Sequence, residues 1–178
     1  MAYGVVRTDN VKATKNGNIR SAKFYDASGN AAAIENGMLV EVSELLNAST
    51  NREIFKAVTP SAGTALNIGV VATPELIYDE SLKSKGALEN FRNEAGMPIT
   101  VLMLAPGDIL SVSDECIDPI NGSTPVAKGQ YVYLTTSTKW KAVADLNGVT
   151  SSLTGQIIAG ELYKQGKYLN VIRVDVAN

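Results

Sequence analysis

The chain contains no histidine and a single cysteine, Cys116. Histidine is the commonest general base near neutral pH and the usual zinc ligand, so its absence excludes Ser-His-Asp catalysis and the usual zinc sites. No phosphate-binding glycine loop, dinucleotide-binding motif or Gly-x-Ser-x-Gly motif occurs. Cys116 has no base beside it, and Asp114, Glu115 and Asp118 would raise its pKa and weaken it as a nucleophile. The sequence therefore predicts a protein that is not an enzyme and that needs no cofactor or metal.

Charged and aromatic residues are also scarce, at 19% and 6%, and the longest apolar runs, such as Val101 to Ala105, are too short to span a bilayer. The hydrophobic fraction of 45% is typical of a globular chain. By area scaling, a protein of this mass buries about 70% of its unfolded surface, which is enough for a real core. The first nine residues contain no apolar segment of a secretory signal, and one cysteine cannot form an internal disulfide. We expect one domain or two small ones, without a membrane span, assembled in a reducing cytosol.

The few charges are unevenly distributed along the chain. The net charge is −2, but residues 1–23 carry +4, which leaves −6 for the remainder. The cations of this segment are Arg7, Lys12, Lys15, Arg20 and Lys23. A basic arm on an acidic body can dock on an acidic protein surface or on nucleic acid. The arm lacks the interleaved aromatics of a single-strand binder, so nucleic acid is not favoured. A solvated terminus without a partner is the alternative.

An internal repeat organises the rest of the chain. The segment Asn36–Val42 returns 92 positions later as Lys128–Leu134, with a glycine second and a valine fifth in both copies. Each copy then contains an aromatic residue followed by Lys-Ala-Val, with Phe55 in the first and Trp140 in the second. Further matches at an offset of 86 join Gly69, Val71, Glu75 and Leu76 to Gly155, Ile157, Glu161 and Leu162. The repeat predicts two related β-units, with seven extra residues of the first copy placed within Ser43–Asn51 as a loop or helical turn.

Short apolar or alternating runs separated by turn residues predict a mainly β fold, an antiparallel β-barrel or sandwich. Asn-Gly occurs four times, beginning at residues 16, 36, 121 and 147, and favours turns with positive φ at both positions. The expected strands are 38–42, 52–58, 68–73, 99–104, 109–113, 131–136, 139–144, 156–162 and 168–176. Residues 114–125 are expected to form a polar loop, whose acidic residues lack the ligand spacing of a calcium-binding EF-hand.

The domain organisation follows from these runs. Residues 1–23 are expected to form an extended basic arm, 24–76 the first β-unit and 99–178 the second. Residues 77–98 form a connector that is partly helical, with a short helix near Ala87 to Asn93 ended by Gly96. Packing of residues 24–178 as one domain is the alternative.

The repeated segments resemble small bacteriophage capsid decoration proteins, also called head-stabilising or cement proteins. The residues that carry the resemblance are Ile34–Val42 with Gly69–Ala72, and Val126–Leu134 with Gly155–Ala159. Each pair joins an apolar, glycine-turned strand to a later glycine followed by Val or Ile and then Ala. About half of the chain is covered, and the opening Met-Ala-Tyr-Gly also looks like a virion structural protein.

The resemblance implies a β protein that stabilises the outer surface of a capsid in the virion, after assembly in the host cytoplasm. Its partner would be the major capsid protein, and it would itself form homo-oligomers such as trimers. The basic arm, through Arg7, Lys12, Lys15 and Arg20, would then lie across capsid subunits. Two other readings stay open: a tail or baseplate structural protein, and a carbohydrate-binding β-module that uses Trp140 or Tyr131.

Overall fold

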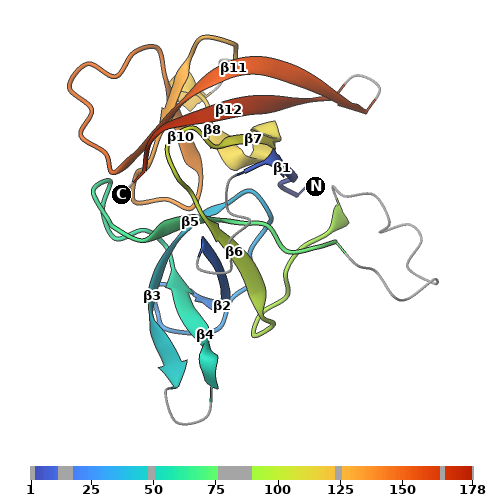
Figure 1. The fold of residues 1–178 in the computed structure, drawn as a ribbon, viewed down its shortest axis with the longest axis vertical. Helices are drawn as coiled ribbons and strands as arrows, with labels where there is room; N and C mark the ends of the chain where they lie inside the picture. Colours follow the sequence, from blue (N-terminus) through green and yellow to red (C-terminus); the bar gives the residue numbers. More distant parts are fainter. Residues whose placement is uncertain are drawn as a thin grey trace.

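The computed structural model describes residues 3–11, 18–47, 51–75, 90–122, 126–164 and 167–177. The fold is mainly β, as predicted, and consists of a five-stranded closed barrel and a seven-stranded sheet, which lie below and above one another in Figure 1. The elements are β1 (Val6–Asn10), β2 (Ile19–Tyr25), β3 (Leu39–Asn47), β4 (Asn51–Val58), β5 (Ile68–Val71), β6 (Ile99–Met103), β7 (Ile109–Val112), η4 (Asp114–Cys116), β8 (Ile117–Asp118), η5 (Ile120–Gly122), β9 (Tyr131–Tyr133), β10 (Trp140–Val143), β11 (Leu153–Lys164) and β12 (Lys167–Ala177).

The barrel has the strand order β2-β4-β3-β5-β6, and it closes where β6 pairs with β2. Alternate side chains along each strand point into the barrel, because successive residues of a strand face opposite sides. Its core consists of Ala22, Phe24, Ile34, Met38, Val40, Val42, Ala57, Val71, Ile99 and Val101. The pairing is antiparallel, as predicted, except between β2 and β4, which run parallel.

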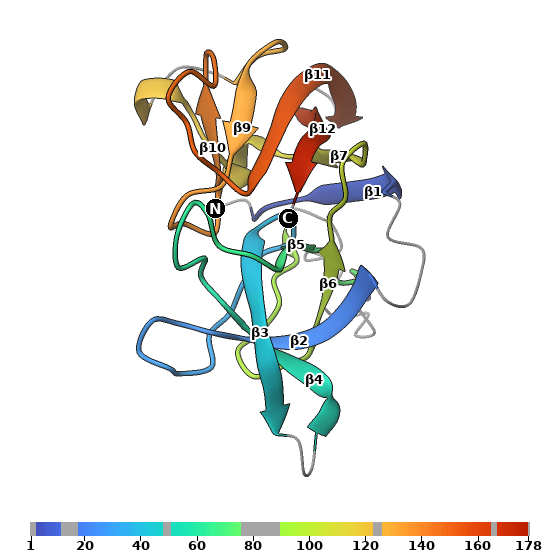
Figure 2. The same cartoon turned by 60° about the vertical axis from the view of Figure 1, so that its left-hand side comes forward.

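The seven-stranded sheet repeats the barrel's strand order. Its strands follow β8-β10-β9-β11-β12, which matches β2-β4-β3-β5-β6 position by position, including a parallel pair at β8 and β10. The difference lies at the last strand. In the barrel β6 returns to β2, whereas β12 pairs with β7, and β1 extends the sheet beyond β7 (Figure 2).

The registers confirm that the sequence repeat is a structural repeat. Val40 pairs with Gly69 in the barrel, and Val132 pairs with Gly155 in the sheet. The amide of Gly37 donates a 2.8 Å hydrogen bond to the carbonyl of Val71, and Gly129 donates one of 2.8 Å to Ile157. Both glycines have positive φ, at 84° and 93°, which explains why glycine occupies this turn in each copy. The two β-units predicted from the sequence are therefore present.

The extra residues of the first copy lengthen a hairpin instead of forming a loop or helical turn. β3 continues to Asn47 and β4 begins at Asn51, so the interpretation as a loop was wrong for residues 43–47 and 51, while 48–50 lie outside the described residues. Two register shifts, on either side of the pair Leu45 and Phe55, let the strand continue past the position where the second copy turns. Figure 1 shows this hairpin projecting from the end of the barrel.

Several other predicted segments differ in detail. Residues 114–122 are not a plain loop, because they contain η4, β8 and η5. Among the described Asn-Gly turns, both residues have positive φ only at Asn121-Gly122; at 36–37 and 147–148 the glycine alone has it. The hairpin of β11 and β12 forms as expected, whereas Gln165-Gly166, Asn16-Gly17 and residues 87–89 lie outside the described residues. The predicted connector helix was wrong over residues 91–93, which are not helical. The described end of the connector holds Asn93, which bridges to Ile34.

The N-terminal segment is extended, and two of its parts are strands of the two sheets. β1 lies at the edge of the seven-stranded sheet, with Val5 and Val6 buried, and β2 belongs to the barrel. Residues 12–17, which join them, lie outside the described part of the chain. The described arm is therefore built into the body of the protein.

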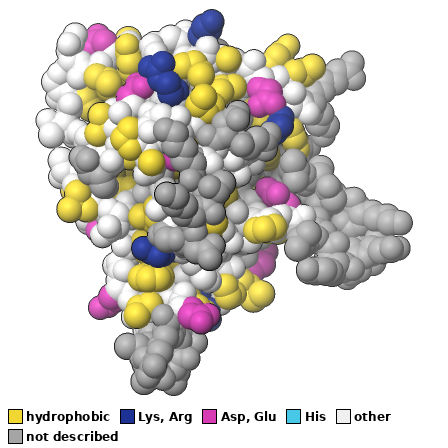
Figure 3. Space-filling model, in the orientation of Figure 1, with side chains coloured by type: hydrophobic (Ala, Val, Ile, Leu, Met, Phe, Trp, Pro, Cys, Tyr) yellow, Lys and Arg dark blue, Asp and Glu magenta, His cyan; other side chains and the backbone are white. Residues whose placement is uncertain are grey.

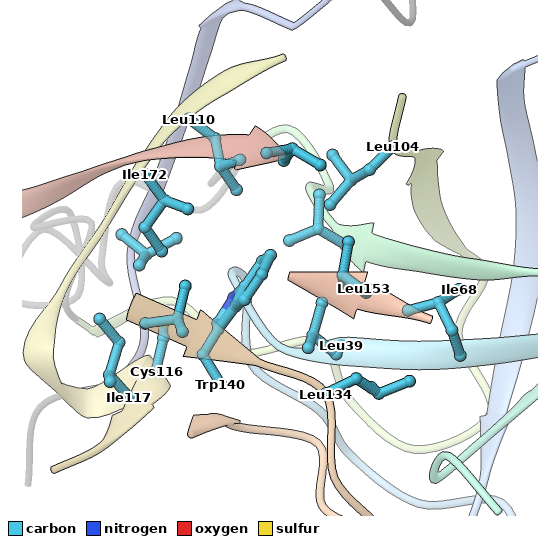
Figure 4. Packing of buried hydrophobic residues seen from close by; sticks show 14 of the residues in the cluster. Leu39, Ile68, Leu104, Leu110, Cys116, Ile117, Leu134, Trp140, Leu153 and Ile172 are labelled. Carbon is cyan, nitrogen blue, oxygen red and sulfur yellow. The ribbon is translucent and has the colours of Figure 1, made fainter. Parts of the chain in front are cut away.

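One hydrophobic cluster joins the two sheets. Trp140, Leu134 and Leu153 of the second unit lie beside Leu39 and Ile68 from the outer wall of the barrel (Figure 4). Two backbone hydrogen bonds cross the same junction: Leu39 donates to Thr138 at 2.6 Å, and Ser152 donates to Gly63 at 2.9 Å. The hydroxyl of Ser152 also donates to the carbonyl of Ala65.

Candidate interaction surface

The hairpin of β11 and β12 carries an exposed apolar pair near its end. Leu162 and Tyr168 lie directly opposite each other across the two strands, and each is 62% exposed. Along β12, Tyr168 lies on the same face as Asn170 and Ile172, and Ile172 is fully buried in the core. The hairpin of β11 and β12 therefore extends beyond the core and projects from the body in Figure 1. On this projecting part, Leu162 and Tyr168 remain in contact with water.

A hollow of about 250 Å³ lies beside this pair. Three of its lining side chains are tyrosines, Tyr3, Tyr163 and Tyr168, and two are carboxylates, Asp114 and Glu115. Tyrosine combines a large apolar ring with a polar hydroxyl, so it is enriched where proteins bind one another. We call Tyr3, Asp114, Glu115, Leu162 and Tyr168 the hairpin surface.

Contacts from other elements hold the hairpin surface in place. The carboxylate of Asp114 accepts a 2.7 Å hydrogen bond from the side-chain amide of Asn170. The guanidinium of Arg92 lies 5.6 Å from the ring centre of Tyr3, which is within cation–π range. The surface thus joins the N-terminal segment, the turn η4 and the hairpin.

The predicted capsid-binding residues do not form one cluster in the described structure. Arg7 lies on β1 and forms an ion pair with Glu161 of β11, whose other oxygen accepts a 2.9 Å hydrogen bond from Ser111. Arg20 lies on β2 in the barrel, with its guanidinium 5.3 Å from the ring centre of Phe55. Lys12 and Lys15 lie outside the described residues. On the described part of the face in Figure 3, basic and acidic side chains are interspersed with hydrophobic ones, and no broad area of one sign is seen.

Cys116 lies at the junction of the two units and is fully buried. Burial, more than any charge, raises the pKa of its thiol to about 12; Glu35 and Glu115 raise it further, and a hydrogen bond with Ser113 opposes them. The predicted increase is confirmed, but its main cause is desolvation and not the neighbouring acids. The thiol donates to the carbonyl of Asn36 at 3.4 Å. Cys116 is thus part of the packed core.

Trp140 and Tyr131 were the candidates for a sugar-stacking platform. Trp140 is completely buried, so its ring faces cannot stack on a sugar, and it is a core residue. Tyr131 is half-buried on β9. Within the described ranges, no group of three or more acidic, cysteine or histidine side chains could hold a metal ion. No helix in the described part of the chain is long and apolar enough to cross a membrane.

The sequence did not single out Leu162 and Tyr168 as surface residues. Their strands were predicted from alternation, but alternation does not reveal where along a strand its covering elements end. An apolar side chain beyond the last covered residue becomes visible only in three dimensions. Comparisons of the chain with protein-family models, with curated proteins and with solved structures gave no match.

Proposed function

We propose that this protein is a non-enzymatic structural protein of a virion that binds the outer surface of an assembled phage capsid. The observation that carries the proposal is the hairpin surface, where an apolar cross-strand pair and a tyrosine-lined hollow are presented to solvent. Exposed apolar groups of this kind gain free energy when a partner covers them, at roughly 25 cal/mol per Å². The sequence resemblance supplies the identity of the partner.

The rigidity of the two fused units also supports binding to a shell. The hydrophobic cluster and the hydrogen bonds at Leu39 and Ser152 connect the barrel to the seven-stranded sheet. A preorganised body loses little conformational entropy on docking, so more of the contact free energy appears as affinity. Because a capsid repeats its surface many times, neighbouring copies or an oligomer would bind with added avidity.

The N-terminal cations enter this proposal at two separate places. Arg7 lies on the outer strand of the sheet beside Glu161, and Arg20 lies at the barrel. A truncation of residues 2–20 would remove β1 and part of β2, and with them buried Val5 and Val6. Single substitutions therefore test the proposal more cleanly than a truncation.

The test is co-sedimentation of the purified protein with empty phage capsids, with negative-stain images of the pellets. Leu162→Ser combined with Tyr168→Ser should weaken capsid binding at least tenfold, because both apolar anchors are lost. Met97→Ser is the matched control, because Met97 is a 60% exposed apolar residue that is not part of the hairpin surface. Thermal melting of each variant verifies that the fold is intact.

The possible results separate the readings. Failure of the unchanged protein to bind capsids rejects the proposed function. Equal loss in the control and in the double variant rejects the hairpin surface as the contact. Images that place the protein on tails instead of heads favour a tail or baseplate role, and added knobs on the capsid surface support decoration.

A further inference from the structure

Arg20 stands at the open end of the five-stranded barrel. Along β2 it lies two and four residues before Ala22 and Phe24, which are buried in the barrel, so it belongs to the inward face. It lines a hollow of about 150 Å³ together with Val42, Ser43, Phe55, Asn67 and Met103. Phe55 and Met103 pack against the barrel core from the same end. The side chain of Arg20 therefore lies at the end of the barrel interior and not on the outer surface of the barrel.

The guanidinium of Arg20 is held by a ring and not by an anion. It lies 5.3 Å from the centre of the Phe55 ring. Three other arginines whose side chains are described, Arg7, Arg92 and Arg173, each pair with a carboxylate. Within the described part of the chain, Arg20 makes no side-chain hydrogen bond or ion pair. Stacking uses the flat face of a guanidinium and leaves its N–H edges available for a carboxylate.

The second unit shows what happens at the equivalent end. The registers match Val42, Asn67 and Met103 of the barrel to Leu134, Leu153 and Val174 of the sheet, and the sequence repeat matches Phe55 to Trp140. These four counterparts are at most 1% exposed, and they pack on Leu39, Ile68 and Val70 from the outer wall of the barrel. In one copy of the unit, this end is thus covered by another part of the protein. In the other copy it is open and carries Arg20 and Asn67 instead of apolar groups.

We propose that the open end of the barrel binds an acidic side chain, Asp or Glu, of a partner protein. The Arg20 guanidinium donates hydrogen bonds to the carboxylate from its edge, and Asn67 lies beside it with a side-chain amide as a further donor. Phe55 and Met103 contact the aliphatic part of the acidic side chain. The inference rests on the proposed function in one respect, since on a phage capsid the acidic residue would belong to the capsid protein.

Glu53 is the internal competitor for this site. It lies on β4 immediately before Ile54, which pairs with Ser21 beside Arg20 on β2, and its side chain is exposed. Its carboxylate makes no ion pair with Arg20 in the described structure. Removal of this charge should leave Arg20 more attractive to an external carboxylate.

The experiment uses N-acetyl-Gly-Glu-Gly-amide as probe and N-acetyl-Gly-Gln-Gly-amide as its uncharged match. In NMR titrations, the Glu peptide should shift the side-chain Nε–H resonance of Arg20 and the backbone amide of Asn67. The paired Arg173 serves as the internal control and should not respond. An equal response to both peptides, or no response of Arg20, overturns the inference.

Variants then locate the recognition. Titrations followed at the backbone amide of Asn67 should show at least tenfold weaker binding of the Glu peptide in both Arg20→Gln and Arg20→Lys. Glutamine removes the charge, whereas lysine keeps the charge but lacks the paired N–H donors of the guanidinium. Glu53→Gln should strengthen binding about twofold to tenfold. Full binding by Arg20→Lys would contradict recognition through the paired N–H donors of the guanidinium. A well-dispersed spectrum verifies that each variant is folded.

Capsid co-sedimentation separates this inference from the proposed function. A response of Arg20 to the Glu peptide without any capsid binding supports the barrel site and rejects the capsid as partner. Capsid binding without a response of Arg20 supports the proposed function and rejects the barrel site. Both results together, with capsid binding weakened in Arg20→Gln, support the two proposals at once.

Discussion

The indole N–H of Trp140 donates a 3.2 Å hydrogen bond to the carbonyl oxygen of Gly37. Both residues belong to the repeat, but to different motifs and different copies: Gly37 is the turn glycine of the first, and Trp140 the aromatic residue of the second. In the sequence repeat, the first copy has Phe55 where the second has Trp140, and Phe55 has no polar side-chain atom. The two copies have thus diverged where one packs on the other, and the junction depends on this tryptophan.

Trp140→Phe should therefore lower the free energy of unfolding by about 1–3 kcal/mol, because it leaves the buried carbonyl of Gly37 without this donor. Urea denaturation followed by far-ultraviolet circular dichroism measures the change. Tyr133→Phe is the control, since it removes a hydroxyl from a half-buried residue of the neighbouring strand and should change stability by less than about 0.5 kcal/mol. Equal stability of the Trp140→Phe variant and the unchanged protein would contradict the role of the indole.

The two turn glycines form a matched pair for a second prediction. Both have positive φ, so Gly37→Ala and Gly129→Ala share a backbone cost of about 1–2 kcal/mol. A Cβ at Gly37 would lie 2.5 Å from the sulfur of Cys116, whereas a Cβ at Gly129 meets nothing within 4 Å. The clash should add about 1–3 kcal/mol to the destabilisation at Gly37 alone.

The clash can be removed independently. In a Cys116→Ala background, the extra destabilisation of Gly37→Ala should shrink, because the next atoms around the new Cβ lie at 3.5 Å or more. Chemical denaturation of the four variants of this double-mutant cycle measures the coupling. Additive effects of the two substitutions would show that the sulfur is not the obstacle.

Cys116 also predicts a pH dependence. Its pKa is raised from 9.0 to about 12 in the folded protein, mainly by burial. Because an unfolded chain loses this proton first, the contribution of the thiol to stability is complete below pH 9 and is lost as the pH rises towards about 12. The unfolding free energy should fall more steeply than in Cys116→Ala, by up to about 1.4 kcal/mol per pH unit in this range. Parallel curves for the two proteins would contradict the burial of the thiol, as would rapid alkylation by iodoacetamide at pH 8 without denaturant.

The sequence was most informative where the structure depends on local pattern. The glycine of each copy, with Val71 and Ile157 as its distant matches, correctly located the hydrogen-bonded turns that start β3 and precede β9. These positions follow from backbone conformation and alternation, which a single chain encodes in short segments.

Other features depend on what packs nearby, and the sequence did not reveal them. The place of β1 beside β7 requires knowing that β12 does not close onto β8. The exposure of Leu162 and Tyr168 depends on where the core beneath β12 ends. The inward position of Arg20 on β2 became clear only once the barrel was closed, because a polar residue in an alternating strand is otherwise read as solvent-facing.

Asn36 gives the last prediction, because it is buried and its amide makes four hydrogen bonds. Its nitrogen donates to the carbonyl of Thr73 at 2.8 Å and to the carboxylate of Glu75 at 2.9 Å. Its oxygen accepts from the backbone amide of Thr73 and from the side chain of Asn93, both at 3.1 Å.

Asn36→Asp replaces the donor by a carboxylate oxygen that faces two acceptors, so the free energy of unfolding should fall by about 3–5 kcal/mol at pH 7. Burial and the charge of Glu75 raise the pKa of the new carboxyl above its unfolded value of about 3.9, so the deficit should diminish as the pH falls towards 4. Asn36→Ala, which adds no charge, should show a deficit that is less dependent on pH. A constant deficit of Asn36→Asp between pH 4 and pH 7 would mean that the side chain escapes to water and that the four hydrogen bonds do not hold it.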